Sequence, residues 1–171
     1  ILRQFDPQRR IFLCTDASAF AIGGVLWQRY GEDPLLVAYV SRRLNKHELN
    51  YSVQELECLA IVYSVKKFRH YLLGSPFEIK VMSDHQSLQY LKKGREAGGR
   101  IARWAMALSE YNYQIEYLPG KKNLLGDALS RLVAIETEHI AEGTRPRQTA
   151  ELASLFPEVH SEIAWQATQG L

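Results

Sequence analysis

Four acidic residues occupy positions from which carboxylates of separate elements could converge. Asp16 and Asp84 each end an apolar run that is predicted to be a strand, and Asp127 falls in the first turn of a predicted helix, where the helix dipole favours a carboxylate. Glu57 lies within a long, largely apolar helical stretch. One such residue alone is usually only a turn residue. Together they could supply the oxygen ligands that two hard divalent cations need, with positions left open for water and phosphate.

The hydrophobic pattern predicts the elements that would position these carboxylates. Three short strands separated by turns come first, as in an antiparallel meander, and from residue 51 the apolar spacing becomes helical. Ser52 and Glu55 have the spacing of a capping box at the start of that helix. Strands are predicted at residues 10–18, 21–29, 35–41, 77–82 and 113–118, and helices at 51–72, 87–92, 100–111 and 123–132. The order predicts an α/β fold, a mixed five-stranded sheet with helices on both faces.

The last part of the chain has a different character. Residues 133–171 contain no strand pattern and carry two weakly amphipathic segments separated by Pro157. Their apolar residues are too sparse to build a core of their own, so short helices there would be marginal. We therefore expect one folded domain over residues 1–132, followed by a connector over 133–171.

Composition excludes several classes of protein. The chain has 171 residues, of which 46% are hydrophobic and 23% charged, which suits one soluble globular domain with an extension. It has neither a continuous apolar run of about 18 residues nor a signal-peptide pattern, and its lack of an initiator Met is typical of an excised fragment. Its two cysteines, Cys14 and Cys58, form no disulfide framework and no Cys/His zinc pattern, and are expected to be small buried hydrophobes.

Basic residues cluster although the formal net charge is only +2. The first cluster falls within twelve positions and the second is a pair: Lys92, Lys93, Arg95, Arg100 and Arg103, then Lys121 and Lys122. Taken alone, such clusters are more often a solvated face than a nucleic-acid contact. The composition by itself leaves both interpretations open.

Five short motifs in a fixed order identify a family. They are Thr15-Asp16-Ala17-Ser18, Glu57-Cys58-Leu59-Ala60-Ile61-Val62, Ser83-Asp84-His85-Gln86-Ser87-Leu88, Arg100-Ile101-Ala102-Arg103-Trp104, and Pro119-Gly120-Lys121-Lys122-Asn123 through Asp127-Ala128-Leu129-Ser130-Arg131. Each motif alone is weakly specific. In this order and at these spacings, over about residues 3–132, the chain resembles the ribonuclease H domain of gypsy-type reverse transcriptases from LTR retrotransposons, carried in a Pol polyprotein.

The resemblance implies an activity and assigns the acids a role. It makes Asp16, Glu57, Asp84 and Asp127 both the catalytic residues and the metal ligands, with two Mg²⁺ ions for which Mn²⁺ could substitute. The implied reaction is endonucleolytic hydrolysis of the RNA strand of an RNA–DNA hybrid, leaving 5′-phosphate and 3′-hydroxyl ends. Glu55 and Glu57 lie about 200° apart around a helix, so only one can face the site, and Glu57 matches the family's Glu-x-x-Ala pattern.

The same resemblance favours phosphate contacts for the basic residues of both clusters. It also implies partners and a location: a polymerase domain upstream, an integrase downstream, and action in the cytoplasm within a virus-like particle or reverse-transcription complex. Trp104 is expected mainly in the core.

Two departures from the ribonuclease H pattern concern the loop before Asp127. Gly126 stands where the family more often has Ala, and residues 119–126 contain no histidine, which leaves the proton donor to the leaving group open. His85, next to Asp84, is the nearest candidate, although a structural role for it is favoured. Two rival functions stay open: a catalytically retired scaffold or hybrid-binding module, and an integrase- or transposase-type domain.

Overall fold

The computed structural model describes most of the first two thirds of the chain. The described residues are 2–31, 33–83, 91 and 99–117. Predictions that fall on other positions, among them the helices at 87–92 and 123–132 and the connector at 133–171, lie outside the described residues. Leu91, from the first of these helices, is helical, and its side chain is buried in the main core cluster.

The first three strands form the predicted antiparallel meander. Strand β1 (Phe12–Ala17) pairs with β2 (Ala21–Tyr30), and β2 pairs with β3 (Asp33–Arg43). The register of β2 and β3 shifts between Leu26 and Trp27, as at a β-bulge. Strand β3 is longer than the predicted strand at both ends. Its residues beyond the apolar run also pair with β2 through the backbone. Such pairing does not depend on apolar side chains, so the hydrophobic pattern did not predict it.

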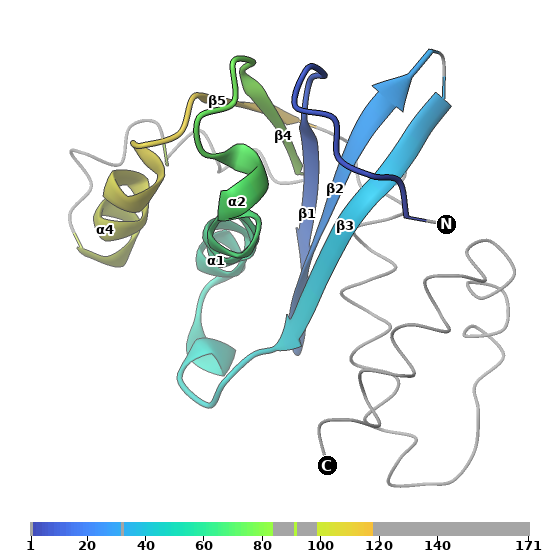
Figure 1. Cartoon of the computed structure of the whole chain (residues 1–171). Helices are drawn as coiled ribbons and strands as arrows, with labels where there is room; N and C mark the ends of the chain where they lie inside the picture. The colour runs from blue at the N-terminus through green and yellow to red at the C-terminus, as the bar shows by residue number, and fades with distance from the viewer. Residues whose placement is uncertain (1, 32, 84–90, 92–98, 118–171) are drawn as a thin grey trace, which may run out of the picture.

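The remaining strands run parallel to β1 on its other side. Strand β4 (Ile79–Ser83) pairs with β1, and β5 (Tyr113–Tyr117) pairs with β4, so that the sheet order is β3-β2-β1-β4-β5 (Figure 1). Since β1 and β4 are parallel neighbours, their carboxyl ends meet at one edge of the sheet. The predicted mixed five-stranded sheet is confirmed.

The helical stretch between β3 and β4 is divided into three pieces. A 3₁₀ turn, η1 (Glu48–Asn50), precedes α1 (Val53–Lys67), and a short α2 (Arg69–Leu72) follows it. The prediction of one helix over 51–72 was therefore wrong at its end. Phe68 leaves the helical region, with φ −91° and ψ 12°, and its side chain is buried in the core, so the chain changes direction there.

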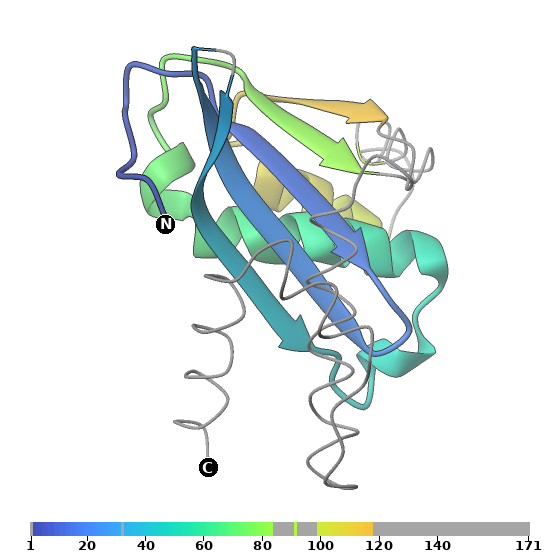
Figure 2. The ribbon, with the colours of Figure 1, turned by 90° about the vertical axis from the view of Figure 1, so that its right-hand side faces the viewer.

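The described helices α1, α2 and α4 (Gly99–Leu108) lie on the same face of the sheet (Figures 1 and 2). Helix α1 is central, because it packs against β1 and β2 on one side and against α4 on the other. The helices predicted for the second face would come from residues outside the described part. None of the helices in the described part is long and apolar enough to cross a membrane.

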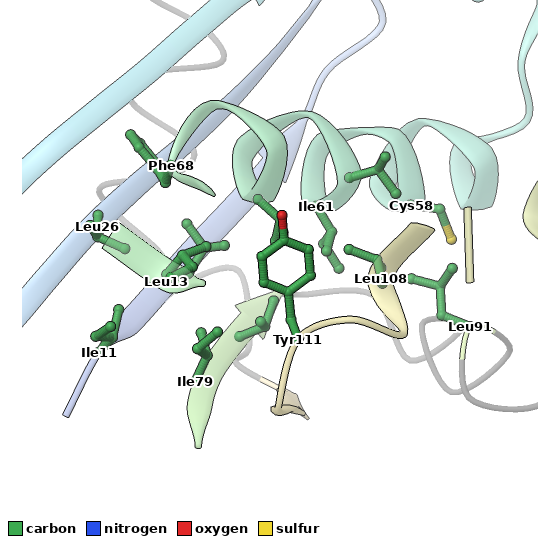
Figure 3. Close-up of a cluster of buried hydrophobic side chains, with 14 of the residues drawn as sticks. Ile11, Leu13, Leu26, Cys58, Ile61, Phe68, Ile79, Leu91, Leu108 and Tyr111 are labelled. Atoms are coloured by element: carbon green, nitrogen blue, oxygen red, sulfur yellow. The ribbon is translucent and has the colours of Figure 1, made fainter. Parts of the chain in front are cut away.

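The core lies between the sheet and α1. Ile11, Leu13 and Leu26 from the sheet side meet Ile61 and Phe68 from the helix side (Figure 3). Helix α1 approaches β2 closely at one point. A Cβ atom added to Gly24 would lie 2.1 Å from Ser64 Oγ, closer than atoms can approach, so a glycine is required there.

Candidate active site

Asp16 lies near the carboxyl end of β1, and only 6% of its surface is exposed. In the parallel ladder, Cys14 pairs with Met82, so Asp16 stands two residues beyond the last paired position of β1. On β4, Ser83 stands one residue beyond that position and ends the strand. The parallel register thus places Asp16 and the end of β4 at the same edge of the sheet.

Glu57 comes to this edge from α1. The helix begins after Ser52, whose side chain accepts a hydrogen bond from the Glu55 backbone N–H, while the Glu55 side chain accepts one from the Ser52 backbone N–H. This reciprocal capping box fixes the start of the helix and therefore the height at which Glu57 meets the sheet. Glu57 is 3% exposed, and Ser83 Oγ donates a hydrogen bond of 3.2 Å to its Oε2 atom.

Asp16 and Glu57 therefore both lie where β1 and β4 end, one on the sheet and one on the helix that covers it. Asp84 directly follows Ser83 in the chain, but Asp84 and Asp127 lie outside the described residues, as does His85. Among the residues that the structure describes, no three His, Cys, Asp or Glu side chains gather as a metal site would require. The two carboxylates that are described have the hard oxygen donors that Mg²⁺ prefers, so this donor set fits the implied cation.

Cys58, next to Glu57 in the chain, is buried and lies near two negative charges. Burial, and next the charges of Glu57 and Glu55, raise the pKa of the neighbouring Cys58 thiol to about 12. Cys58 is 1% exposed and belongs to the main core cluster. Cys58 therefore stays a protonated thiol at neutral pH and adds no charge beside Glu57, in agreement with its prediction as a small buried hydrophobe.

The two glutamates at the start of α1 are separated as the helical geometry predicted. Glu55 is engaged at the helix start, and its Oε1 also accepts a hydrogen bond of 2.5 Å from Arg100 Nη1 of α4. The hydrogen bond from the Ser52 backbone, foremost among several causes, lowers the pKa of the Glu55 carboxyl. The predicted capping box is confirmed, and of the two carboxylates it is Glu57 that contacts Ser83 at the sheet edge.

Arg100 and Arg103 were both predicted to contact nucleic acid, but they differ in the structure. The Arg100 guanidinium pairs with Glu55 and lies 3.8 Å from the centroid of the Tyr51 ring. Arg103 is exposed on the same helix. Lys92, Lys93, Arg95, Lys121 and Lys122, the other predicted contacts, lie outside the described residues. Of the two described members of the set, Arg103 is exposed, whereas Arg100 is engaged with Glu55.

Trp104 is half-buried rather than fully buried. It packs against both hydrophobic clusters, and its ring lies 6.2 Å from that of Tyr51, centroid to centroid. Trp104 therefore ties α4 to the start of α1. Its expected core role is confirmed at this seam between the two helices.

Sequence reasoning missed Ser83 as a residue of the site. The available signal was its place beside Asp84, at the last position of a strand whose residues alternate between buried and half-buried. That alternation predicts an inward-facing side chain at residue 83, and a serine there needs a partner. Glu57 is that partner, and a pattern that treats helix and strand separately does not pair the two.

Solved structures share this fold. A foamy viral protease–reverse transcriptase in complex with an RNA/DNA hybrid superimposes with a TM-score of 0.55 and 23% identity, over 71% of this chain and 17% of that one. The N-terminal RNase H domain of rv2228c from Mycobacterium tuberculosis superimposes with a TM-score of 0.57 and 17% identity, over 78% of this chain and 99% of that one. At these identities the likeness shows the fold, which is that of ribonuclease H.

Curated sequences are more similar. The Retrovirus-related Pol polyprotein from transposon 297 of Drosophila melanogaster is 48% identical over 145 residues, and the Transposon Tf2-3 polyprotein of Schizosaccharomyces pombe is 42% identical over 143 residues. These matches cover 85% and 82% of this chain, but only 13% and 11% of the polyproteins. The family model described as the RNase H-like domain found in reverse transcriptase matches residues 6–111. The chain therefore belongs to the family of RNase H-like domains of reverse transcriptases, in the form carried by the Pol polyproteins of LTR retrotransposons.

Proposed function

We propose that this domain is an endonuclease that hydrolyses the RNA strand of RNA–DNA hybrids during reverse transcription. The observation that carries the proposal is the placement of two buried carboxylates, Asp16 and Glu57, at the shared edge of β1 and β4 in a member of this family. Carboxylates are seldom buried to this degree in proteins, and a catalytic site is one setting in which buried carboxylates are found.

The carboxylates are proposed to act as ligands for two Mg²⁺ ions, with Mn²⁺ able to substitute. Asp16 contributes from the sheet and Glu57 from the helix, and Asp84 and Asp127 are the remaining ligands that the motifs assign. When bound, such a pair of ions lowers the pKa of an attacking water and stabilises the leaving 3′ oxygen. The protein's part is to hold the oxygen ligands still and to leave room for the scissile phosphate.

Recognition of the hybrid is proposed to involve the basic residues on and before α4. Arg103 is exposed on that helix, and Lys92, Lys93 and Arg95 precede it in the chain. Phosphate contacts of this kind position a duplex without reading its sequence. Contacts to the 2′-hydroxyl groups of the RNA strand would tell the two strands apart.

The wider context of the domain is also a proposal. The chain spans 11–13% of the length of the polyproteins that it matches. We propose that a polymerase domain precedes it and an integrase follows it in such a polyprotein. It would then act in the cytoplasm, within a virus-like particle or a reverse-transcription complex.

The proposal is tested with a gel assay on end-labelled substrates. The chain is incubated with an RNA–DNA hybrid, double-stranded RNA and double-stranded DNA, each with Mg²⁺, with Mn²⁺ or with a chelator. We expect metal-dependent cleavage of the RNA in the hybrid alone, leaving 5′-phosphate and 3′-hydroxyl ends, and loss of that cleavage in Asp84→Asn.

Each rival function would give a different result. Binding of the hybrid without cleavage under any metal condition would indicate a retired, hybrid-binding module. Joining of DNA strands would indicate an integrase-type domain. Either result would overturn the proposed activity.

A further inference from the structure

Ser83 joins the sheet to the glutamate of the candidate site. It is the last residue of β4, its surface is 0% exposed, and its hydroxyl donates 3.2 Å to Glu57 Oε2, across 26 residues of sequence. We propose that Ser83 is a positioning residue, which orients the Glu57 carboxylate for the divalent cations. This inference rests on the proposed function, because it gives Ser83 a role through a metal ligand.

A glutamate on a helix needs such a constraint. Its carboxylate stands at the end of three rotatable bonds, whereas a cation requires its oxygen ligands at defined distances and angles. The capping box fixes the backbone at the start of α1, but not the rotamers of Glu57. The hydrogen bond from Ser83 fixes the end of the side chain against the sheet. A carboxylate offers about four lone-pair sites, so Oε2 can accept this bond and still bind a cation.

A second buried serine shows that a hydroxyl in this interface does not by itself imply a hydrogen bond. Ser64 lies on α1, is also 0% exposed, and packs against Gly24 of β2. Within the described part of the chain, the Ser64 hydroxyl has no hydrogen-bond partner. Ser83 differs because its hydroxyl is directed at a carboxylate. Ser64 therefore provides a matched control.

The hydrogen bond between Ser83 and Glu57 also connects Glu57 to the residue next to Asp84. Ser83 directly precedes Asp84, the ligand that the motif assigns after β4. A single residue therefore ties Glu57 to the end of the strand from which Asp84 continues. Removing a group that hydrogen-bonds to a metal ligand commonly lowers metal affinity or activity by about 10–100-fold.

The test compares Ser83→Thr with Ser83→Val. Both side chains are β-branched and nearly equal in volume, so any crowding at this buried position affects them equally, and only threonine keeps the hydroxyl. The first readout is the affinity for Mg²⁺ and Mn²⁺, measured by isothermal titration calorimetry on the whole chain without nucleic acid. The second is the Mg²⁺ concentration that gives half-maximal hybrid cleavage. Thermal unfolding without metal reports the fold of each variant.

We expect Ser83→Val to bind Mg²⁺ about tenfold more weakly than Ser83→Thr, and to need a correspondingly higher Mg²⁺ concentration for cleavage. Ser83→Ala is expected to weaken binding in the same way without adding volume. Ser64→Ala removes an equally buried hydroxyl and should leave both quantities unchanged.

Equal affinities for the Thr and Val variants would overturn the proposal, as would a Ser83→Ala chain that differs from the wild type only in melting temperature. If the wild type binds metal but does not cleave hybrids, the proposed function fails, while the affinity comparison still decides the role of Ser83. A wild-type chain that binds neither cation overturns both.

Discussion

At the scale of single residues, the candidate site depends on two buried carboxylates, Asp16 from the sheet and Glu57 from the helix that covers it. Asp16 lies near the carboxyl end of β1, as expected from its position at the end of an apolar run and in a short motif. Glu57 had to be distinguished from Glu55, and two signals did so: the capping role available to Glu55 and the match of Glu57 to the family's Glu-x-x-Ala pattern. The contact of Glu57 with Ser83 could not be predicted, since it depends on how the helix is seated on the sheet.

The ion pair between Arg100 and Glu55 leads to a prediction about the two arginines of α4. Arg100 stands in the first turn of its helix, where a cation opposes the helix dipole, and Glu55 offsets that cost. The salt dependence of hybrid binding is the slope of the logarithm of the binding constant against the logarithm of the salt concentration. We expect Arg103→Ala to reduce the magnitude of this slope by about 0.9, and Arg100→Ala to change it less.

A double-mutant cycle on stability provides the control. Arg100→Ala and Glu55→Gln should be coupled by about 0.5 kcal/mol in the free energy of unfolding, a modest value because the pair is partly exposed. If the two variants lose stability additively, and Arg100→Ala also reduces the salt dependence of hybrid binding, Arg100 is a phosphate contact instead.

At the scale of elements, the entry into α1 is held by an ion pair that sequence reasoning did not detect. Arg42, near the end of β3, donates two hydrogen bonds to Glu48 of η1, at 2.7 and 2.8 Å, and the Asn45 backbone N–H donates a third. Such bidentate pairs are among the stronger charge-assisted contacts. They fix the 3₁₀ turn that leads to the Ser52 cap, and so they help to place Glu57.

This pair predicts a dependence of stability on pH. The hydrogen bonds from Arg42 lower the pKa of the Glu48 carboxyl from its ordinary 4.5; burial opposes this shift, and the hydrogen bond from the Asn45 backbone adds to it. The ionised Glu48 carboxylate therefore stabilises the fold fully at pH values above its ordinary pKa. This stabilisation is lost as the pH falls through the lower pKa of the folded state. At about pH 7, Glu48→Gln should lower the free energy of unfolding, measured with urea, by about 2 kcal/mol. The difference between the wild type and the variant should become smaller at acidic pH. A difference that stays constant with pH would contradict this account.

The close approach of α1 to β2 gives a second prediction at this scale. Gly24→Ala would place a Cβ atom against Ser64 and should destabilise the fold by about 2 kcal/mol. Adding Ser64→Gly should recover part of that loss, so that the double variant loses less than the sum of the two single ones in chemical unfolding. Strictly additive losses would show that the helix does not approach the strand at this point.

At the scale of the whole molecule, the sheet topology was largely predictable and the helix boundaries were less so. The meander followed from three short apolar runs, and a mixed sheet followed from the helical segments that precede the later strands, but the position of β4 next to β1 was not predicted. The break at Phe68 did not follow, because the apolar periodicity continues through that residue, whose φ of −91° and ψ of 12° depart from helical values. The Ser83–Glu57 contact joins a strand and a helix across 26 residues of sequence, and local patterns do not encode it. The Arg42–Glu48 pair is closer in the chain, but it depends on the turn between β3 and η1, which hydrophobic periodicity does not describe.

The expected boundary near residue 132 leads to a prediction about the connector. Truncation after Leu132 should leave a folded, metal-binding core with nearly the same melting temperature, because the assigned ligands all precede that position. Limited proteolysis of the full chain should cut first between Thr137 and Gln148. A truncated chain that fails to fold, or a connector as resistant to protease as the core, would show that residues 133–171 are part of the domain.

The central claim is that the carboxylates at the edge of β1 and β4 carry out metal-dependent hydrolysis of RNA in a hybrid. The most direct measurement is the single-turnover cleavage rate of four variants in Mg²⁺, with circular dichroism confirming each fold. Asp16→Asn and Glu57→Gln should each lower the cleavage rate more than about a hundredfold. This is a larger loss than is usual when a residue that only hydrogen-bonds to a metal ligand is removed. Asp6→Asn removes a carboxylate that pairs with Arg9 before β1 begins, and Glu55→Gln keeps a side-chain oxygen that can accept the hydrogen bond from the Ser52 backbone, so both should cleave at nearly the wild-type rate. Wild-type cleavage by Asp16→Asn or Glu57→Gln, or equal losses in all four variants, would contradict the account.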